Sequence, residues 1–558
     1  MKGVPIPSKD PYFNLGEYRR NISASNDESR HWFNRGLIWC YSFNHEEAVY
    51  CFEQALLHDE SCPLAYWGLA YALGPNYNKP WEFYDGDELR RTVERTHEAV
   101  LKASKHAAER GSDVERALCD AIVKRYPEKK PGEDLTIWND SYAEAMRRVH
   151  TQFPTDLDVA ALCVDALMNL KPWQLWDIKT GEPSPDAPTR EVKGILDDAL
   201  KLPGALEHPG LLHLYIHFWE MSPHPENALA ISDGLRSLVP DAGHLQHMPT
   251  HLDVLCGDYR RAIASNLQAA RADEAFLAKR GGVNFYTLYR CHDYHFAIYA
   301  AMLGGQSKLA LSLASRLEST ITEDLLRLTS PPMADWIESF IAVRVHVLVR
   351  FGKWHDLLDL PVPSDSQLYC NTTAMVYYGK GVAAAALGRV DDAVAYRDRF
   401  RDAAARVPES RTLFNNRCTD ILQIAAAMLD GEIAYRKADY EAAWTSLRTA
   451  VERDDTLPYD EPWGWMQPAR HAYGALLLEQ GKVEEACEVY AADLGMNDTL
   501  PRQLQHLNNV WALHGFHECL VRLGRTSEAN VLRPQLKLAL AFADVEVKSS
   551  CFCRLNTT

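Results

Sequence analysis

The sequence lacks long apolar runs and basic stripes. No window reaches the roughly 18 apolar residues of a membrane-spanning helix. The N-terminus, MKGVPIPSKDPYFNLGEYRR, has no apolar stretch long enough for a signal peptide. The 59 Lys and Arg are outnumbered by 76 Asp and Glu, which gives a net charge of −17, and no run of bases forms a stripe that could neutralise phosphates. We therefore expect a cytoplasmic protein that binds neither nucleic acid nor a membrane.

Closely spaced cysteines are also scarce. The thirteen cysteines are scattered through segments of helical character, without the dense spacing of a disulfide framework. Reduced and mostly buried thiols are therefore expected. Cys551 and Cys553, near the end of the chain, could bind a metal or carry a lipid. They have no partner pair, however, and an unmodified tail is the simpler interpretation.

A short phrase recurs along the chain: a turn residue, three or four mostly polar residues, and Ala five positions on. Each copy lies between apolar runs at helical spacing, which predicts the tight turn of an antiparallel helix pair. In several copies a small residue precedes the turn by seven positions and a bulky one follows it by nine, as Gly474 and Tyr490 flank Gly481. The copies are FNHEEA (43–48), GDYRRA (257–262), GQSKLA (305–310), GRVDDA (388–393), ADYEAA (438–443), GKVEEA (481–486) and GRTSEA (524–529).

This pattern resembles the tetratricopeptide repeat (TPR), and the resemblance implies an all-α, TPR-like solenoid of stacked antiparallel helical hairpins. The turns are spaced irregularly, so the array is expected to be distorted, with the option of curling around a central pocket. The predicted segments are an N-terminal extension (1–27), TPR-like hairpins (28–170), a long loop rich in Pro and turn residues (171–200), a histidine-rich helical segment (201–330), further TPR-like repeats (331–540) and a tail (541–558).

Histidine is concentrated in one part of the chain. Nine of the 21 histidines lie within residues 208–295, where even scatter would place about three. His213 and His217 are four residues apart and Glu220 follows three later, so a helix presents all three on one face. The next hairpin carries His247 and His251 at the same spacing.

A third segment carries His292 and His295. Equivalent helices of successive hairpins line one wall of an array, so the three segments could converge on one metal site. Pro249 complicates this prediction, because proline is comfortable only in the first turn of a helix. A helix that begins there would leave His247 just outside it, with its side chain free to point elsewhere.

Imidazole-rich sets suit Cu, Zn, Fe or Ni, and the few nearby acids disfavour Ca or Mg. Two histidines with Glu220 would suit a non-haem iron. Two groups of three histidines would suit a pair of copper ions, and a single zinc ion with a bound water would support hydrolysis. HLYIH lacks the Glu of HExxH, so the usual zinc-protease arrangement is absent. We expect a transition metal, Cu or Fe first and Zn second, in an enzyme of oxidative chemistry on a small molecule, with Glu220 and Asp293 as catalytic candidates.

The alternative is that the histidines are separate residues, hydrogen-bonded or half-exposed, as most helical histidines are. The chain would then be a non-catalytic scaffold that binds a peptide or protein partner through its repeats. A scaffold leaves its concave face open and polar, whereas an enzyme encloses a pocket with perturbed histidines.

The phrases EHPGLLHLYIHFWE, GHLQHMPTHLDVL and GPNYNKP, with EPWGWMQPARHAYG, resemble a widespread bacterial and fungal group of TPR proteins over about residues 30–530. The resemblance implies the fold and names no reaction. Asn rather than Asp293 is expected in that group. Its other marked residues suggest a weaker substrate-binding set, although Asn favours turns for backbone reasons. That set is His45, Asn76, Asn78, Glu461 and Arg470.

Overall fold

Helices make up nearly all of the regular structure in residues 5–555, which the computed structural model describes. The extreme ends of the predicted N-terminal extension and tail lie outside these residues. The only strands described are β1 (Thr412–Leu413) and β2 (Asn416–Arg417), which form an antiparallel ribbon. The all-α prediction is confirmed. Within the described chain, no helix combines the length and the apolar character needed to cross a membrane.

The chain forms two compact units. The first takes the described residues up to Leu252 and Gln268–Gly281, and the second takes Asp253–Leu267 and the described residues from Gly282 onward. The division therefore runs through the predicted histidine-rich segment, and the other predicted segment boundaries stay predictions.

The first unit contains α1 (Asp27–Tyr41), α2 (His45–His58), α3 (Pro63–Leu73), α4 (Gly86–Arg110), α5 (Asp113–Ile122), α6 (Thr136–Gln152), α7 (Leu157–Met168), α8 (Thr189–Ala199), α9 (Pro209–Glu220), α10 (Leu229–Leu235) and α11 (Gly243–His247). Residues of α12 (Pro249–Leu255) and α13 (Tyr259–Arg280) belong to both units.

The second unit continues with α14 (Thr287–Leu303), α15 (Ser307–Thr320), α16 (Glu323–Leu326), α17 (Met333–Ile337), α18 (Val343–Arg350), α19 (Trp354–Asp359), α20 (Cys370–Ala386), α21 (Val390–Ala404), α22 (Cys418–Arg436), α23 (Tyr440–Asp455), α24 (Ala469–Glu479), α25 (Val483–Asp493), α26 (Val510–Arg522) and α27 (Thr526–Phe542).

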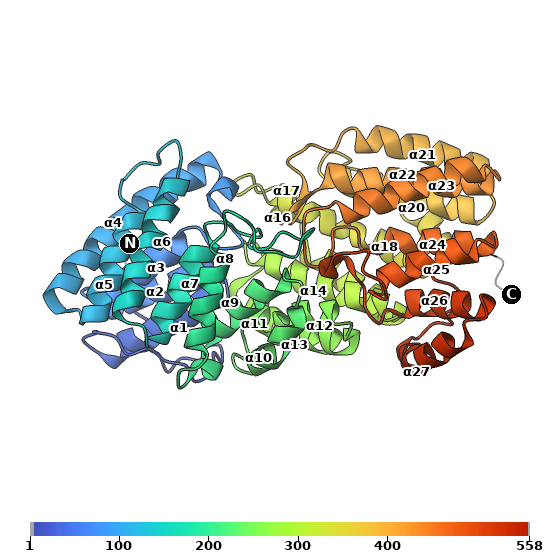
Figure 1. Cartoon of the computed structure of the whole chain (residues 1–558). Coiled ribbons are helices and arrows are strands. Elements are labelled where there is room, and N and C mark those ends of the chain that lie inside the picture. Colours follow the sequence, from blue (N-terminus) through green and yellow to red (C-terminus); the bar gives the residue numbers. More distant parts are fainter. Residues whose placement is uncertain (1–4, 556–558) are drawn as a thin grey trace. The chain divides into compact units, whose positions relative to one another are not determined.

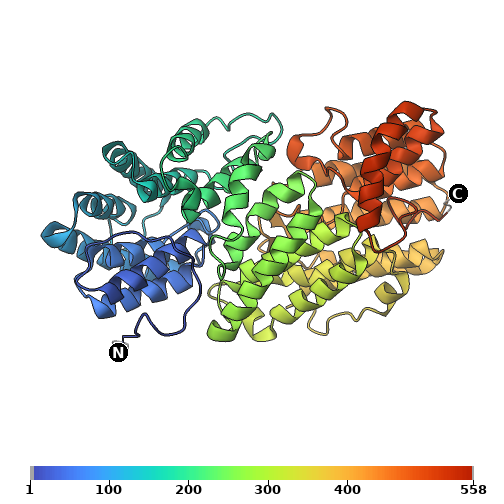
Figure 2. The ribbon, with the colours of Figure 1, turned by 90° about the horizontal axis from the view of Figure 1, so that it is seen from below.

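Consecutive helices pack as pairs: α1 with α2, α3 with α4, α14 with α15, α20 with α21, α22 with α23, α24 with α25 and α26 with α27. Except for α15, which is not labelled, the paired helices can be found by label in Figure 1, and Figure 2 shows the same ribbon from below. Successive pairs also contact one another, as α2 does α3 and α25 does α26. Consecutive helical hairpins are the arrangement that the recurring phrase predicts.

The backbone confirms all seven predicted turns. The residue that opens each copy of the phrase has a positive φ, the region where a side chain costs energy and glycine does not. Five of the seven are glycine; the others are Ala438, with φ 60°, and Phe43, with φ 55°.

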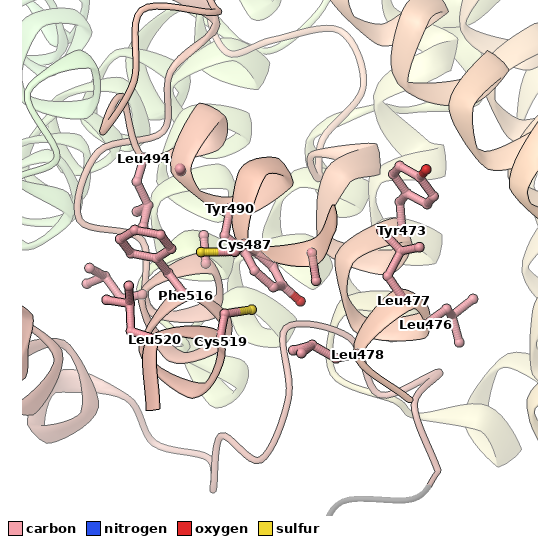
Figure 3. Packing of buried hydrophobic residues seen from close by; sticks show 14 of the residues in the cluster. Tyr473, Leu476, Leu477, Leu478, Cys487, Tyr490, Leu494, Phe516, Cys519 and Leu520 are labelled. Carbon is pink, nitrogen blue, oxygen red and sulfur yellow. The ribbon is translucent and has the colours of Figure 1, made fainter. Parts of the chain in front are cut away.

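Small residues at fixed positions let the helices of a hairpin approach. A Cβ on Gly474 would lie 2.6 Å from the ring of Tyr490, and one on Gly515 would lie 2.4 Å from the same ring. Tyr490 is fully buried, and Figure 3 shows its ring packed beside Cys487 and Cys519, near Phe516. The Gly474 and Tyr490 pair predicted from the repeat pattern is therefore a packing contact.

Replacing Gly474 by alanine is expected to lower the free energy of unfolding by about 1–3 kcal/mol, because the added methyl group overpacks this core. A matched control is Gly194→Ala on α8, where a Cβ would meet nothing within 4 Å; alanine there should stabilise the helix by about 0.5–1 kcal/mol. Urea unfolding of both variants measures the two effects. Equal effects of the two substitutions would contradict the packing role of Gly474.

The loop predicted over 171–200 is shorter than expected. Irregular chain follows α7 as far as Pro188, and α8 then begins at Thr189. The helix forms because Val192, Leu196 and Ala199 make a buried apolar row at helical spacing. The loop is tied to α9 by the indole N–H of Trp176, which donates to the carbonyl of Phe218 at 2.8 Å.

The cysteine prediction holds for eleven residues and fails for two. Cys551 and Cys553 are joined in a disulfide, with Cα atoms 5.2 Å apart, a spacing that allows the bond. Neither can then serve as a thiolate ligand or lipid carrier. The segment is docked, since the Ser550 hydroxyl donates to the carbonyl of His471 at 2.7 Å and Arg554 pairs with Glu518 at 2.7 Å.

Candidate metal centre

Helix α9 carries the first two predicted ligands into the interior of the first unit. His208 caps it: its Nδ1 accepts the N–H of Leu211 at 3.1 Å, and Pro209 takes the first helical position. Every residue of α9 is buried. His213 and His217 therefore project into a core rather than toward water.

The chain around Pro249 keeps His247 in the site. Helix α11 ends at His247 and α12 begins at Pro249, yet the N–H of Met248 donates to the carbonyl of His244 at 3.0 Å. The turn thus continues through the break, and Nε2 of His247 lies 2.7 Å from Nε2 of His251. The anticipated displacement of His247 does not occur.

His213, His217 and His244 form a group that could hold a metal ion, because one ligand atom from each lies within 4.8 Å of the others. The Nδ1–H of His213 donates to the carbonyl of Tyr41 at 2.6 Å, and that of His217 donates to Glu220 at 2.8 Å. Each ring then presents Nε2 as a lone pair, and among the described residues neither Nε2 has a hydrogen-bond partner. An unpartnered buried polar atom costs about 1–3 kcal/mol, so a bound cation would explain both.

Glu220 binds two histidines at once. Its Oε1 accepts from Nδ1 of His217 and its Oε2 accepts from Nδ1 of His251, both at 2.8 Å. All three side chains are at most 1% exposed. This is the outer-shell arrangement that fixes imidazole orientation in metal sites and raises ligand basicity. Glu220 is thus a positioning residue here, and its catalytic role stays a prediction.

Burial keeps His213 and His217 neutral. It lowers the pKa of His213 to about 3, against a smaller opposing effect of the Tyr41 carbonyl. Burial and the neighbouring imidazoles also lower the pKa of His217 well below its ordinary value. Neutral imidazole is the form that binds metals, so these rings are ready to coordinate at neutral pH.

Three aromatic rings wall the group. Phe43 lies 4.4 Å from His213, 5.7 Å from His217 and 5.6 Å from His244 by ring centroids. Tyr77 and Trp173 contact His217 at 5.0 and 5.7 Å. Trp173 comes from the loop after α7 and is half-buried, so this loop covers the site. The apolar wall lowers the local dielectric constant and limits water.

Two of these aromatic residues have a left-handed backbone conformation, with φ 55° at Phe43 and 58° at Trp173. Such strain in bulky residues gathers at functional sites. Tyr77 lies in the GPNYNKP motif, whereas neither Phe43 nor Trp173 was predicted to belong to the site. A signal for Phe43 was available, because it occupies the position that glycine fills in five of the seven turn phrases.

Phe43→Gly is expected to keep the turn and weaken the site. Glycine suits this φ, but the lost ring removes buried contacts, so the free energy of unfolding should fall by about 1–3 kcal/mol. Metal affinity should fall about 10-fold. Ala438→Gly is the matched control, since it relaxes an exposed turn of similar φ and should leave metal affinity unchanged. Competition titration and thermal melts measure both, and unchanged affinity in Phe43→Gly would contradict the wall's role.

The weaker candidates in the first unit have local partners. The side-chain oxygen of Asn76 accepts the N–H groups of Asn78 and Lys79, both at 3.0 Å, which closes the turn. His45 lies 6.1 Å from Phe43, its Nδ1 donates to the carbonyl of Ala72 at 3.1 Å, and burial lowers its pKa to about 4. Their substrate-binding roles stay predictions.

The remaining candidates lie in the second unit. His292, Asp293 and His295 are all buried on α14, and convergence of this third segment with the other two stays a prediction. Arg470 pairs with Asp455, and Glu461 accepts the hydroxyl of Tyr459.

His346 of the second unit gives a pH-dependent stability. Burial lowers its pKa to about 3, whereas an unfolded histidine has a pKa near about 6.5. The contribution of His346 to the free energy of unfolding is therefore complete above the unfolded-state pKa of about 6.5. It decreases as the pH falls from there toward 3, because in that range only the unfolded state takes up the proton. At pH 5.5 each such histidine should lower the free energy of unfolding by about 1.4 kcal/mol. Urea unfolding of wild type and His346→Gln at pH 7 and 5.5 measures this, and an identical pH effect in both would contradict it.

Comparison with protein-family models and with curated proteins finds no match. Similar solved structures include the crystal structure of the APC/C hetero-tetramer Cut9–Hcn1, with a TM-score of 0.32 and 13% identity over 91% of this chain and 79% of that chain. Another is the structure of Naa15/Naa10 bound to HypK-THB, with a TM-score of 0.21 and 13% identity over 92% of this chain and 70% of that chain. The predicted membership of a histidine-motif group stays a prediction.

Proposed function

We propose that the protein is a metal-dependent enzyme that performs oxidative chemistry on a small molecule, with the metal held by His213, His217 and His244. The supporting observation is the pair of buried Nε2 atoms of His213 and His217, each without a partner on a ring whose Nδ1 is fixed. A peptide-binding scaffold gives no reason to bury them.

The donor set favours copper as the metal. Both oxygens of Glu220 accept imidazole N–H groups, which speaks against the two-histidine, one-carboxylate set of non-haem iron. Three imidazoles suit copper, which would supply one-electron exchange with O₂ and the substrate; iron ranks next. Zinc with three histidines and a bound water would support hydrolysis, which is the second candidate function after oxidation by copper or iron.

The residues around the group have distinct tasks. Glu220 and the Tyr41 carbonyl hold the imidazole rings in one orientation and one tautomer. Phe43, Tyr77 and Trp173 exclude bulk water, and a small substrate would reach the metal past the loop of Trp173. His45 Nε2, which is buried and has no partner within the described chain, would accept a hydrogen bond from such a substrate.

The test is metal content and activity of protein purified without a polyhistidine tag. Mass spectrometry should find at least one equivalent of copper or iron, and His213→Ala should lose it. Oxygen uptake with ascorbate as reductant should follow the bound metal, with His213→Ala as the control for free metal. Bound zinc with ester hydrolysis and no oxygen uptake would replace the first candidate by the second. No metal after reconstitution with each ion would overturn the proposal.

A further inference from the structure

A second histidine pair lies next to the proposed metal group. His247 and His251 are buried, their ring centroids are 4.7 Å apart, and their Nε2 atoms face each other at 2.7 Å. The rings of the two sets are neighbours, with His217 and His251 at 5.9 Å and His244 and His247 at 5.8 Å.

The contact between the two Nε2 atoms restricts what can lie there. Nδ1 of His251 donates to Glu220, so Nε2 of neutral His251 carries a lone pair. Nε2 of His247 must then supply a proton, or both nitrogens must share a cation. Metal–nitrogen bonds of about 2.0–2.1 Å place two ligand nitrogens about 2.9–3.4 Å apart, so a small outward shift of the two rings from the observed 2.7 Å would admit an ion.

Glu220 connects this pair with the first group. One of its oxygens orients His217 and the other orients His251, so a single carboxylate fixes one imidazole on each side. Paired metal ions in proteins lie about 3.5–4 Å apart. Two ions held by ring sets whose centroids lie 5.8 and 5.9 Å apart would be close neighbours.

We propose that His247 and His251 bind a second transition-metal ion, copper first, beside the ion assigned to His213, His217 and His244. This inference rests on the proposed function and deepens it: the centre is dinuclear, and Glu220 couples the two sets of ligands. A copper pair can hold two electrons, which suits a two-electron oxidation with O₂ as oxidant: the small substrate loses two electrons and two protons, and O₂ takes them up as H₂O₂.

The test is copper stoichiometry by anaerobic Cu(I) titration of the full-length protein against a chromophoric chelator. Wild type should bind two equivalents, and His251→Ala and His247→Ala should each bind one. His247→Ala is included because it removes a ligand of the second ion without disturbing the two hydrogen bonds to Glu220, which come from His217 and His251. His224→Ala, which removes an exposed histidine, should bind two, and circular dichroism establishes that each variant is folded.

Electron paramagnetic resonance gives a second readout. The Cu(II)-loaded wild type should be largely silent because two adjacent ions couple, whereas His247→Ala should show a mononuclear signal. One equivalent in wild type, unchanged in His247→Ala and His251→Ala, would overturn the second site and leave the proposed function standing. No copper in any variant would overturn the copper pair and leave the proposed function to its own test with iron and zinc.

Discussion

Glu220→Ala is expected to lower the free energy of unfolding by about 2–6 kcal/mol, because it removes the acceptor of two buried N–H groups, each of which costs about 1–3 kcal/mol when unsatisfied. The substitution leaves the Nδ1–H groups of His217 and His251 without their acceptor in a core where Glu220 is fully buried. Urea unfolding of metal-free protein, followed by tryptophan fluorescence, measures the loss.

The matched control is Glu226→Ala, which removes the exposed partner of His224. It should change the free energy of unfolding by less than about 0.5 kcal/mol, as surface substitutions do. The loss of unfolding free energy in Glu220→Gln should lie between those of Glu220→Ala and Glu226→Ala. The amide oxygen can accept one of the two imidazole N–H groups, but the amide NH₂ would face the other donor. A loss below about 1 kcal/mol in Glu220→Ala would contradict the role of this carboxylate as the joint acceptor.

His217→Ala is expected to lower metal affinity by at least about 100-fold. Loss of an outer-shell partner alone costs about 10- to 100-fold, and this substitution removes a ligand nitrogen and frees one oxygen of Glu220. Competition titration with a chromophoric chelator measures the change, and His224→Ala is the control because it removes an exposed histidine from the same region. Equal affinity of His217→Ala and wild type would remove His217 from the site.

Local sequence patterns predicted what depends on local spacing. The turn phrase fixed the hairpins, because a positive φ after an apolar helical run selects small residues. The i, i+4 histidine pairs predicted rings on one helix face, and α9 confirms it. The complication raised by Pro249 does not displace His247, because the hydrogen bonds across the break keep His247 in register.

What sequence could not give depends on distant segments. The acceptor for His213 is the backbone carbonyl of Tyr41. Because every residue has a backbone carbonyl, the sequence does not indicate which one accepts the hydrogen bond. Trp173 reaches His217 from a loop 44 residues earlier in the sequence, so only tertiary packing reveals the contact. The link through Glu220 needs α9 and α12 to be neighbours, which no spacing within either helix encodes.

The most direct test of the account is anomalous diffraction from crystals of the untagged protein, recorded at the copper, iron and zinc absorption edges. A metal ion bound at this group should give a peak at one of these edges within about 2.3 Å of Nε2 of both His213 and His217. Crystals grown with each ion that show no peak there, or a peak only at exposed histidines such as His224, would contradict it.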